Sequence, residues 1–155
     1  MTSIAMTSPA APALRRRIAA TLGVLGWFPH ALQQLLFRFA VGSVFLKAGL
    51  VKVQSWDTTV ALFRDEYQVP LFSPDVAAMM ASTVELGCSA LLVAGLATRL
   101  ATLPLLGMLA VIQLFVYPSA WPEHLVWGSI LVALLTRGGG AISVDRLLGL
   151  EPSRQ

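Results

Sequence analysis

Residues 81–99, ASTVELGCSALLVAGLATR, decide the fold class of this chain. The stretch is almost wholly apolar, and its nineteen residues come close to the roughly 20 that a transmembrane helix needs. A carboxylate, Glu85, lies within it, where a bilayer offers no water. A charge in hydrocarbon costs about 2.5–3.5 kcal/mol on insertion scales, so Glu85 predicts a buried partner or a functional site.

The composition of the whole chain agrees with a membrane protein. Of its 155 residues, 56% are hydrophobic and only 12% are charged, against about 25% charged in soluble domains. The net charge of +3 is small and not clustered, so nucleic acid is not an expected partner. A single cysteine, Cys88, excludes a disulfide within the chain.

Four apolar segments are long enough to be predicted as spans. Their connections are short, except the first, and short connections join antiparallel helices. Lipid satisfies no backbone polar group, so each segment should be helical. We therefore predict an all-α integral membrane protein, a four-transmembrane-helix bundle with spans at 32–53, 74–96, 97 or 98 to 117, and 121–137.

The longer first connection, residues 54–73, predicts a short interfacial helix in the first outer loop. On a helix its apolar and polar side chains separate into two faces. The apolar face would hold Trp56, Val60 and Phe63, and the polar face Asp57, Arg64 and Asp65.

The bundle with its closing helix is expected at residues 31–148, followed by a C-terminal tail at 149–155. Residues 1–30 read as an N-terminal cytoplasmic or interfacial segment. Within it, LRRRIAATLGVLGWF resembles a signal peptide, but no small-residue cleavage site follows. An uncleaved amphipathic segment is the preferred interpretation, and cleavage stays open.

The basic residues predict the orientation, because cytoplasmic loops carry an excess of Lys and Arg. With four spans, most arginines fall on one side, and Arg64 on the other is offset by three acids. Both termini should therefore be cytoplasmic. The arginines on that side are Arg15, Arg16, Arg17, Arg99, Arg137, Arg146 and Arg154.

The first span carries a stripe of cations and glycines on one helical face. At 100° per residue, its members fall within about 40° of one line, while Lys47 lies opposite. Glycines let a partner backbone come close. The stripe consists of Arg38, Gly42, Phe45, Gly49 and Lys52.

A matching face on the second span surrounds Glu85 with small residues, chiefly Ser82 and Ser89. We expect this face to pack on the glycine stripe, with Arg38 and Lys52 each about 10 Å from Glu85 in depth. Arg38 is the expected partner. The pair reads equally well as a structural clamp or as a ligand or proton site.

A second polar set is expected in the outer half, where Gln113 and Tyr117 share a face and His124 lies near Trp127. A histidine beside aromatic rings could bind a quinone headgroup, whereas a surface-facing histidine is the plainer interpretation. His124 has no second ligand at a fixed spacing, so no metal site is expected.

Together these residues resemble the DoxX family of small four-span membrane proteins over about residues 35–148. The first span resembles the family pattern R…G…F…G..K, and the second resembles E…G…L…GL.TR, ending at Arg99. The C-terminal GGGAISVD resembles GPG..SLD, with Gly139 and Val144 as departures. Its matching positions are Gly138, Gly140, Ser143 and Asp145.

The resemblance implies a bacterial inner-membrane subunit of a redox complex linked to the quinone pool, in sulfur or redox- or metal-stress chemistry. It implies a bound quinone as cofactor and a protein partner that carries redox cofactors, because the chain has no motif for holding one tightly. Two alternatives stay open: a non-catalytic anchor or assembly partner, and a small transporter. A homo-oligomer is also compatible, and the electron donor and catalytic residues are not identified.

Overall fold

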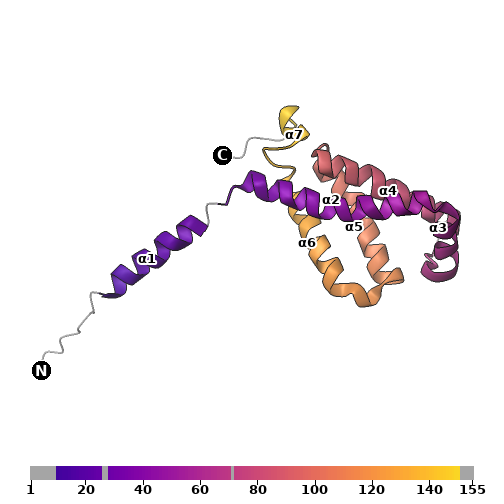
Figure 1. Ribbon diagram of the computed structural model, residues 1–155, viewed down its shortest axis with the longest axis horizontal. Helices are drawn as coiled ribbons and strands as arrows, with labels where there is room; N and C mark the ends of the chain where they lie inside the picture. The colour runs from indigo at the N-terminus through magenta and orange to yellow at the C-terminus, as the bar shows by residue number, and fades with distance from the viewer. Residues whose placement is uncertain (1–9, 26–27, 71, 151–155) are drawn as a thin grey trace, which may run out of the picture.

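The computed structural model describes residues 10–25, 28–70 and 72–150, and within these ranges it contains helices and no strand (Figure 1). The long helices are α1 (Ala10–Leu25), α2 (His30–Gln54), α4 (Pro74–Ala94), α5 (Thr98–Val111) and α6 (Trp121–Arg137). Helices α2, α4 and α6 begin and end within two residues of predicted spans, whereas α5 begins as predicted but ends six residues earlier.

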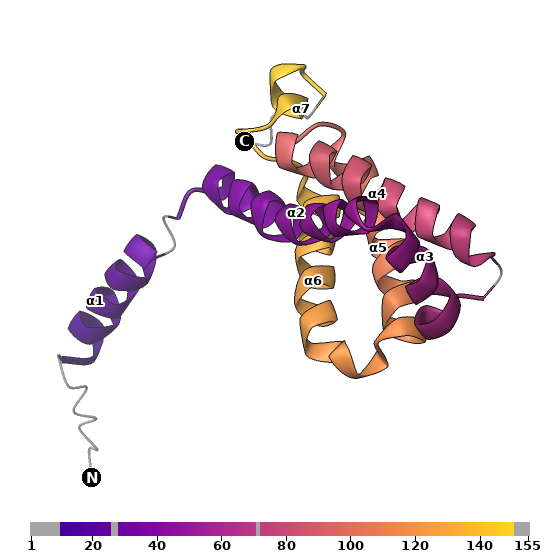
Figure 2. The ribbon, with the colours of Figure 1, turned by 45° about the vertical axis from the view of Figure 1, so that its right-hand side comes forward.

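Helices α2 and α4 pack along an antiparallel seam, side by side in Figures 1 and 2. Two glycines of α2 make the close approach possible. A Cβ on Gly42 would lie 2.9 Å from Val93 Cγ2, and one on Gly49 would lie 2.9 Å from Glu85 Cβ. The predicted stripe therefore does face the predicted small-residue face.

Helices α5 and α6 form the second antiparallel pair, which runs steeply across α2 in both ribbon views (Figure 2). Helix α5 continues as a turn of π-helix, η2 (Ile112–Val116), and a 3-10 turn, η3 (Pro118–Ala120), leads into α6. The main core lies where the two pairs meet. It consists of Val41, Phe45, Leu92, Ala101, Leu105, Leu109, Leu131 and Leu134.

The first connection contains α3 (Trp56–Leu62) and a turn of π-helix, η1 (Phe63–Tyr67). Val60 and Phe63 of the predicted apolar face are buried against Ala77 and Ala78 at the start of α4, whereas Trp56 stays partly exposed. This segment is thus fixed to the bundle.

The C-terminal end contains the short closing helix that the sequence predicts. Helix α6 stops before Gly138, whose φ of 81° suits glycine, and α7 (Val144–Leu147) follows. Ser143 caps α7, because its side-chain oxygen accepts a hydrogen bond from the Arg146 backbone N–H at 3.2 Å.

Helix α1 lies apart from the bundle in both ribbon views. Its three arginines, Arg15 to Arg17, are exposed. Leu14, Ile18 and Leu22 follow each other at spacings of four and are exposed on one side. This is the amphipathic pattern predicted for the N-terminal segment.

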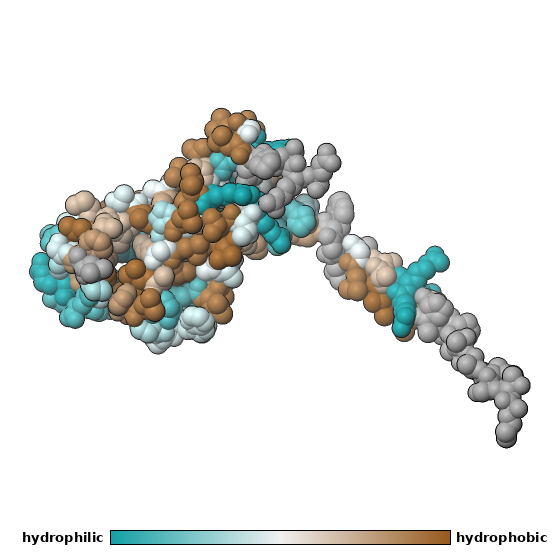
Figure 3. Space-filling model, turned by 180° about the vertical axis from the view of Figure 1, so that it is seen from behind, coloured by the Kyte–Doolittle hydropathy of each residue, from teal (hydrophilic) through white to brown (hydrophobic). Residues whose placement is uncertain are grey.

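Among the residues that the structure describes, three helices are long and apolar enough to cross a membrane: His30–Gln54, Pro74–Ala94 and Thr98–Val116. Apolar residues cover much of the bundle in Figure 3, and hydrophilic ones gather at the end where α3 lies. Helix α6 has 17 residues and spans about 25 Å at 1.5 Å per residue, slightly less than a hydrocarbon core of roughly 30 Å.

Candidate functional site

Glu85 has a different partner from the one predicted. The Lys52 Nζ–H donates to Glu85 Oε1 at 2.7 Å, and Arg38 does not take part. The carboxylate is 3% exposed, and its Oε2 has no hydrogen-bond partner among the described residues. The buried acid is therefore only half satisfied.

The register of the α2–α4 seam explains why Glu85 pairs with Lys52 and not with Arg38. Gly49 lies directly against Glu85, so Lys52, three residues later, comes within reach of the carboxylate. Arg38 lies eleven residues before Gly49, which is about 16 Å along the helix. The sequence predicted both helix faces but not the axial register between them. The prediction therefore placed Glu85 midway between the two cations.

Arg38 instead joins three chain segments through backbone carbonyls. Its Nη1 donates to Gly139 O at 2.9 Å and to Ile142 O at 2.6 Å, and its Nη2 donates to Val93 O at 3.0 Å. Val93 lies in the last turn of α4, where unpaired carbonyls and the helix dipole favour a cation. Arg38 is 2% exposed; its bond to Gly139 O is buried, and its bonds to Ile142 O and Val93 O are partly buried.

Gly95 makes room for this guanidinium. Its φ of 72° ends α4 in the left-handed conformation that favours glycine. A Cβ here would lie 2.6 Å from Arg38 Nη1, so any other residue would displace the arginine.

Asp145 is the anionic counterpart of Arg38, and it binds backbone N–H groups at the start of α5. Its Oδ1 accepts from Ala97 N at 2.6 Å and its Oδ2 from Thr98 N at 2.9 Å, while its own N–H donates to Gly95 O at 2.9 Å. A carboxylate at the positive end of a helix is a favourable cap. We call Arg38, Asp145 and the backbone groups they bind the Arg38 clamp.

The remaining family-motif residues surround this clamp. Gly140, with φ of 84°, packs so closely that a Cβ would lie 2.8 Å from Gln34 Cβ. Gly138 is buried after α6, and Arg99 is partly buried in the first turn of α5. The C-terminal motif thus packs against the clamp in this fold.

The outer polar set divides into two parts. Gln113 Oε1 lies 2.6 Å from His124 Nδ1, and the His124 and Trp127 rings are 5.6 Å apart. Gln113 also donates to Pro118 O at 2.8 Å. Three of the four predicted residues are therefore together, and His124, 6% exposed, is not a surface histidine.

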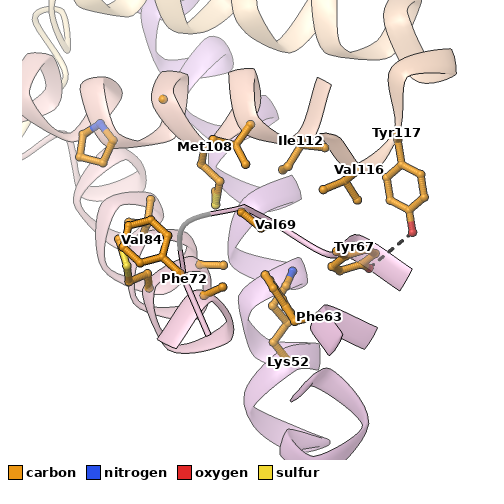
Figure 4. Close-up of a pocket in the computed structure, with 16 residues that line it drawn as sticks. Lys52, Phe63, Tyr67, Val69, Phe72, Val84, Met108, Ile112, Val116 and Tyr117 are labelled. Carbon is orange, nitrogen blue, oxygen red and sulfur yellow. Dashed lines mark hydrogen bonds between the residues drawn. The ribbon is translucent and has the colours of Figure 1, made fainter. Parts of the chain in front are cut away.

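Tyr117 belongs to a different cluster. Its hydroxyl donates to Glu66 Oε1 at 3.1 Å and lies 3.4 Å from the hydroxyl of Tyr67, joining η1 to the end of η2 (Figure 4). The hydrogen bond with Tyr67, partial burial and the Glu66 carboxylate all raise the pKa of Tyr117. It stays a neutral donor at physiological pH.

A cavity of about 410 Å³ lies between these elements and is the feature that the sequence did not reveal. Lys52 forms part of its wall near Phe63, and Tyr67 and Tyr117 stand at one end (Figure 4). Apart from these groups its lining is apolar. The lining residues are Lys52, Phe63, Tyr67, Val69, Phe72, Ala77, Met80, Ala81, Val84, Pro104, Gly107, Met108, Val111, Ile112, Val116 and Tyr117.

The cavity could not be found from residue types alone, because valine, isoleucine and methionine in a membrane span normally indicate lipid contact or core. Its two tyrosines were a weak signal. Arg38 and His124 lie outside the lining, so the cavity and not the predicted pair of Glu85 with Arg38 is the candidate ligand site. Within the described ranges, no group of three His, Cys, Asp or Glu side chains could hold a metal ion.

Comparison with known proteins gives one family. A family model described as DoxX matches residues 33–118, which is 86 of the 155 residues. The match runs from the first turn of α2 to the first residue of η3 and includes Lys52 and Glu85, while Asp145 lies beyond it. No curated protein and no solved structure matches the chain.

Proposed function

The chain belongs to the DoxX family, and from this premise we propose that it is a quinone-binding membrane subunit of a bacterial redox complex. A partner subunit would carry the tightly bound electron-transfer cofactors, because the sequence has no motif for holding one. A quinone held by this chain would exchange electrons and protons with the lipid pool.

One observation carries the proposal: an apolar cavity inside a membrane protein with a single ammonium group on its wall. Its volume of about 410 Å³ lies within the roughly 300–1,000 Å³ usual for ligand sites. Quinone carbonyl oxygens accept hydrogen bonds and the ring is flat and apolar, so Lys52 and the aromatic rings of Phe63 and Tyr67 fit both properties.

The residues of the chain would hold and orient the headgroup. Lys52 has three N–H donors and gives one to Glu85, which leaves donors for a ligand oxygen. Glu85 lies outside the lining and keeps the ammonium in place from behind. Tyr67 and Tyr117 close one end of the cavity with hydroxyl groups.

We also propose the finer topology, with α6 as a fourth span, α3 near the outer interface and both termini in the cytoplasm. The contacts of α6 with α5 support it, since these antiparallel neighbours share one core. Helix α1, with its exposed arginines and leucines, would lie on the inner leaflet. Reporter fusions at either terminus and after Ser119 test the orientation: an outside terminus would overturn it.

The functional test is quinone binding by the purified chain in nanodiscs. We expect extraction to yield quinone and a short-chain quinone to bind, with Lys52→Met reducing its affinity at least about tenfold. The matched control is Lys47→Met, because Lys47 is an exposed cation on the opposite side of the same helix. Absence of extractable and titratable quinone would contradict the proposal.

A second candidate is an architectural anchor, which the position of the Lys52–Glu85 pair on the glycine seam favours. Charge exchange separates the two. If Lys52→Glu with Glu85→Lys restores the activity of a native redox partner, the pair only fixes helix register. If the exchanged pair folds but fails, the ammonium has to face the cavity.

A further inference from the structure

The ammonium on the cavity wall is not a free charge. Lys52 Nζ is 2.7 Å from Glu85 Oε1, and the carboxylate is 3% exposed and outside the lining. The pair therefore presents a hydrogen-bond donor to the cavity while its net charge is zero. A lone lysine at this position would present a full positive charge.

The other polar groups of the cavity do not add a cation. Tyr67 and Tyr117 contribute phenol hydroxyls, and the Tyr117 hydroxyl donates to Glu66, a carboxylate and not a cation. An anion that approached Lys52 would thus meet one cation already bound by a carboxylate. In a medium of low dielectric constant, this like-charge repulsion is only weakly screened.

We propose that Glu85 is a specificity-determining residue that makes the cavity select neutral amphiphiles and reject anionic ones, such as fatty-acid or sulfonate anions. A neutral ligand oxygen accepts a hydrogen bond from Lys52 without separating the ion pair. An anion would have to compete with Glu85 and leave that carboxylate buried without a counter-charge, which is costly. This inference rests on the cavity proposed above as the quinone site.

The selection would matter inside a bilayer, where the cavity adjoins a large excess of lipid tails. Neutral membrane-soluble molecules with an acceptor oxygen can all accept the hydrogen bond from Lys52, and quinones belong to this class. Anionic amphiphiles match the cavity equally well in shape and apolar character, so only charge separates the two groups. Glu85 provides that separation without touching the ligand.

The test compares two probes of equal chain length, dodecanol and dodecanesulfonate, the second being an anion at every working pH. Tritiated probes are bound to the full chain in nanodiscs of zwitterionic phosphatidylcholine. The intact chain should bind dodecanol at least about tenfold more tightly than dodecanesulfonate. In Glu85→Gln the sulfonate affinity should rise at least about tenfold, because Lys52 becomes an unpaired cation.

Two further variants complete the design. Glu123→Gln removes the same charge at an exposed position in the first turn of α6, and it should behave as the unchanged chain. Lys52→Met with Glu85→Gln leaves no charge, and it should not bind the sulfonate. Size-exclusion chromatography and thermal unfolding establish that each variant is folded.

Equal affinity of the intact chain for both probes, or binding of neither, would overturn the inference, even if Glu85→Gln failed to fold. An unchanged sulfonate affinity in folded Glu85→Gln would also overturn it. A quinone titration in the same nanodiscs separates this inference from the proposed function. If the intact chain discriminates between the two probes but binds no quinone, the selectivity for neutral ligands is supported and the proposed quinone function is rejected.

Discussion

Two cations of the same helix stripe, Arg38 and Lys52, are stabilised in different ways. Arg38 donates to three backbone carbonyls, and with Asp145 it fixes the ends of α4, α5 and α6. Lys52 has a charged side chain as its partner, lies beside a cavity and retains unused donors. The difference indicates that the first cation maintains the fold and the second is available for a ligand.

The distinction depends on what remains when each cation is removed. Backbone carbonyls cannot be mutated away, so the loss of Arg38 leaves three of them without their donor. The partner of Lys52 is a side chain, so both charges can be replaced together. The predictions below test this contrast, beginning with the largest expected effect on stability.

Arg38→Met should lower the free energy of unfolding by about 3–5 kcal/mol, because three backbone acceptors, in one buried and two partly buried bonds, lose a charged donor. Chemical or thermal unfolding in detergent, followed by circular dichroism, measures it. Lys47→Met is the control, since Lys47 is exposed on the same helix and its loss should change stability by less than about 0.5 kcal/mol. Similar effects of the two substitutions would contradict the clamp.

Asp145→Asn should cost about 1–3 kcal/mol, because an amide can offer one acceptor oxygen where the carboxylate offers two to Ala97 N and Thr98 N. Hydrogen exchange should also become faster at the start of α5. Asp65→Asn removes the same charge at an exposed site and should leave both measurements unchanged. An equally stable Asp145→Asn protein would show that the motif does not fix α5.

Gly49→Ala should destabilise the seam by about 1–3 kcal/mol through overpacking against Glu85 and Leu86. Gly87→Ala on α4 is the matched control, because its Cβ would meet no atom within 4 Å. That control should be neutral or stabilising by up to about 1 kcal/mol, since alanine favours helix. Equal destabilisation of both variants would contradict the seam as described.

The sequence predicts the bundle well because its signals are local. Apolar length defines the spans, and helical periodicity places Gly42, Gly49 and Glu85 on the faces that meet. These features depend on one segment at a time.

The partner of Glu85 could not be predicted, because it depends on how two helices slide and cross. The acceptors of Arg38 are backbone carbonyls, which have no letter in the sequence. The cavity arises from the packing of η1 and the ends of α4 and α5, so its apolar residues look like ordinary span residues. Tyr117 was grouped with His124 by spacing, but the end of η2 directs it to Tyr67 instead.

The smallest stability change is expected for the double variant Lys52→Met with Glu85→Gln. Replacing both members of a buried ion pair by residues of similar volume is often nearly neutral, so we expect a change within about 1 kcal/mol. Lys52→Met alone should cost more, about 3 kcal/mol, because Glu85 then stays buried without a counter-charge. Unfolding of both variants in detergent checks these values, and a quinone titration of the double variant checks function.

If the double variant is stable but no longer binds quinone, the pair is retained for its ligand, in contrast to Arg38, whose donors bind backbone carbonyls of three residues. A double variant that binds quinone as tightly as the unchanged chain would instead assign both cations of the stripe to the fold.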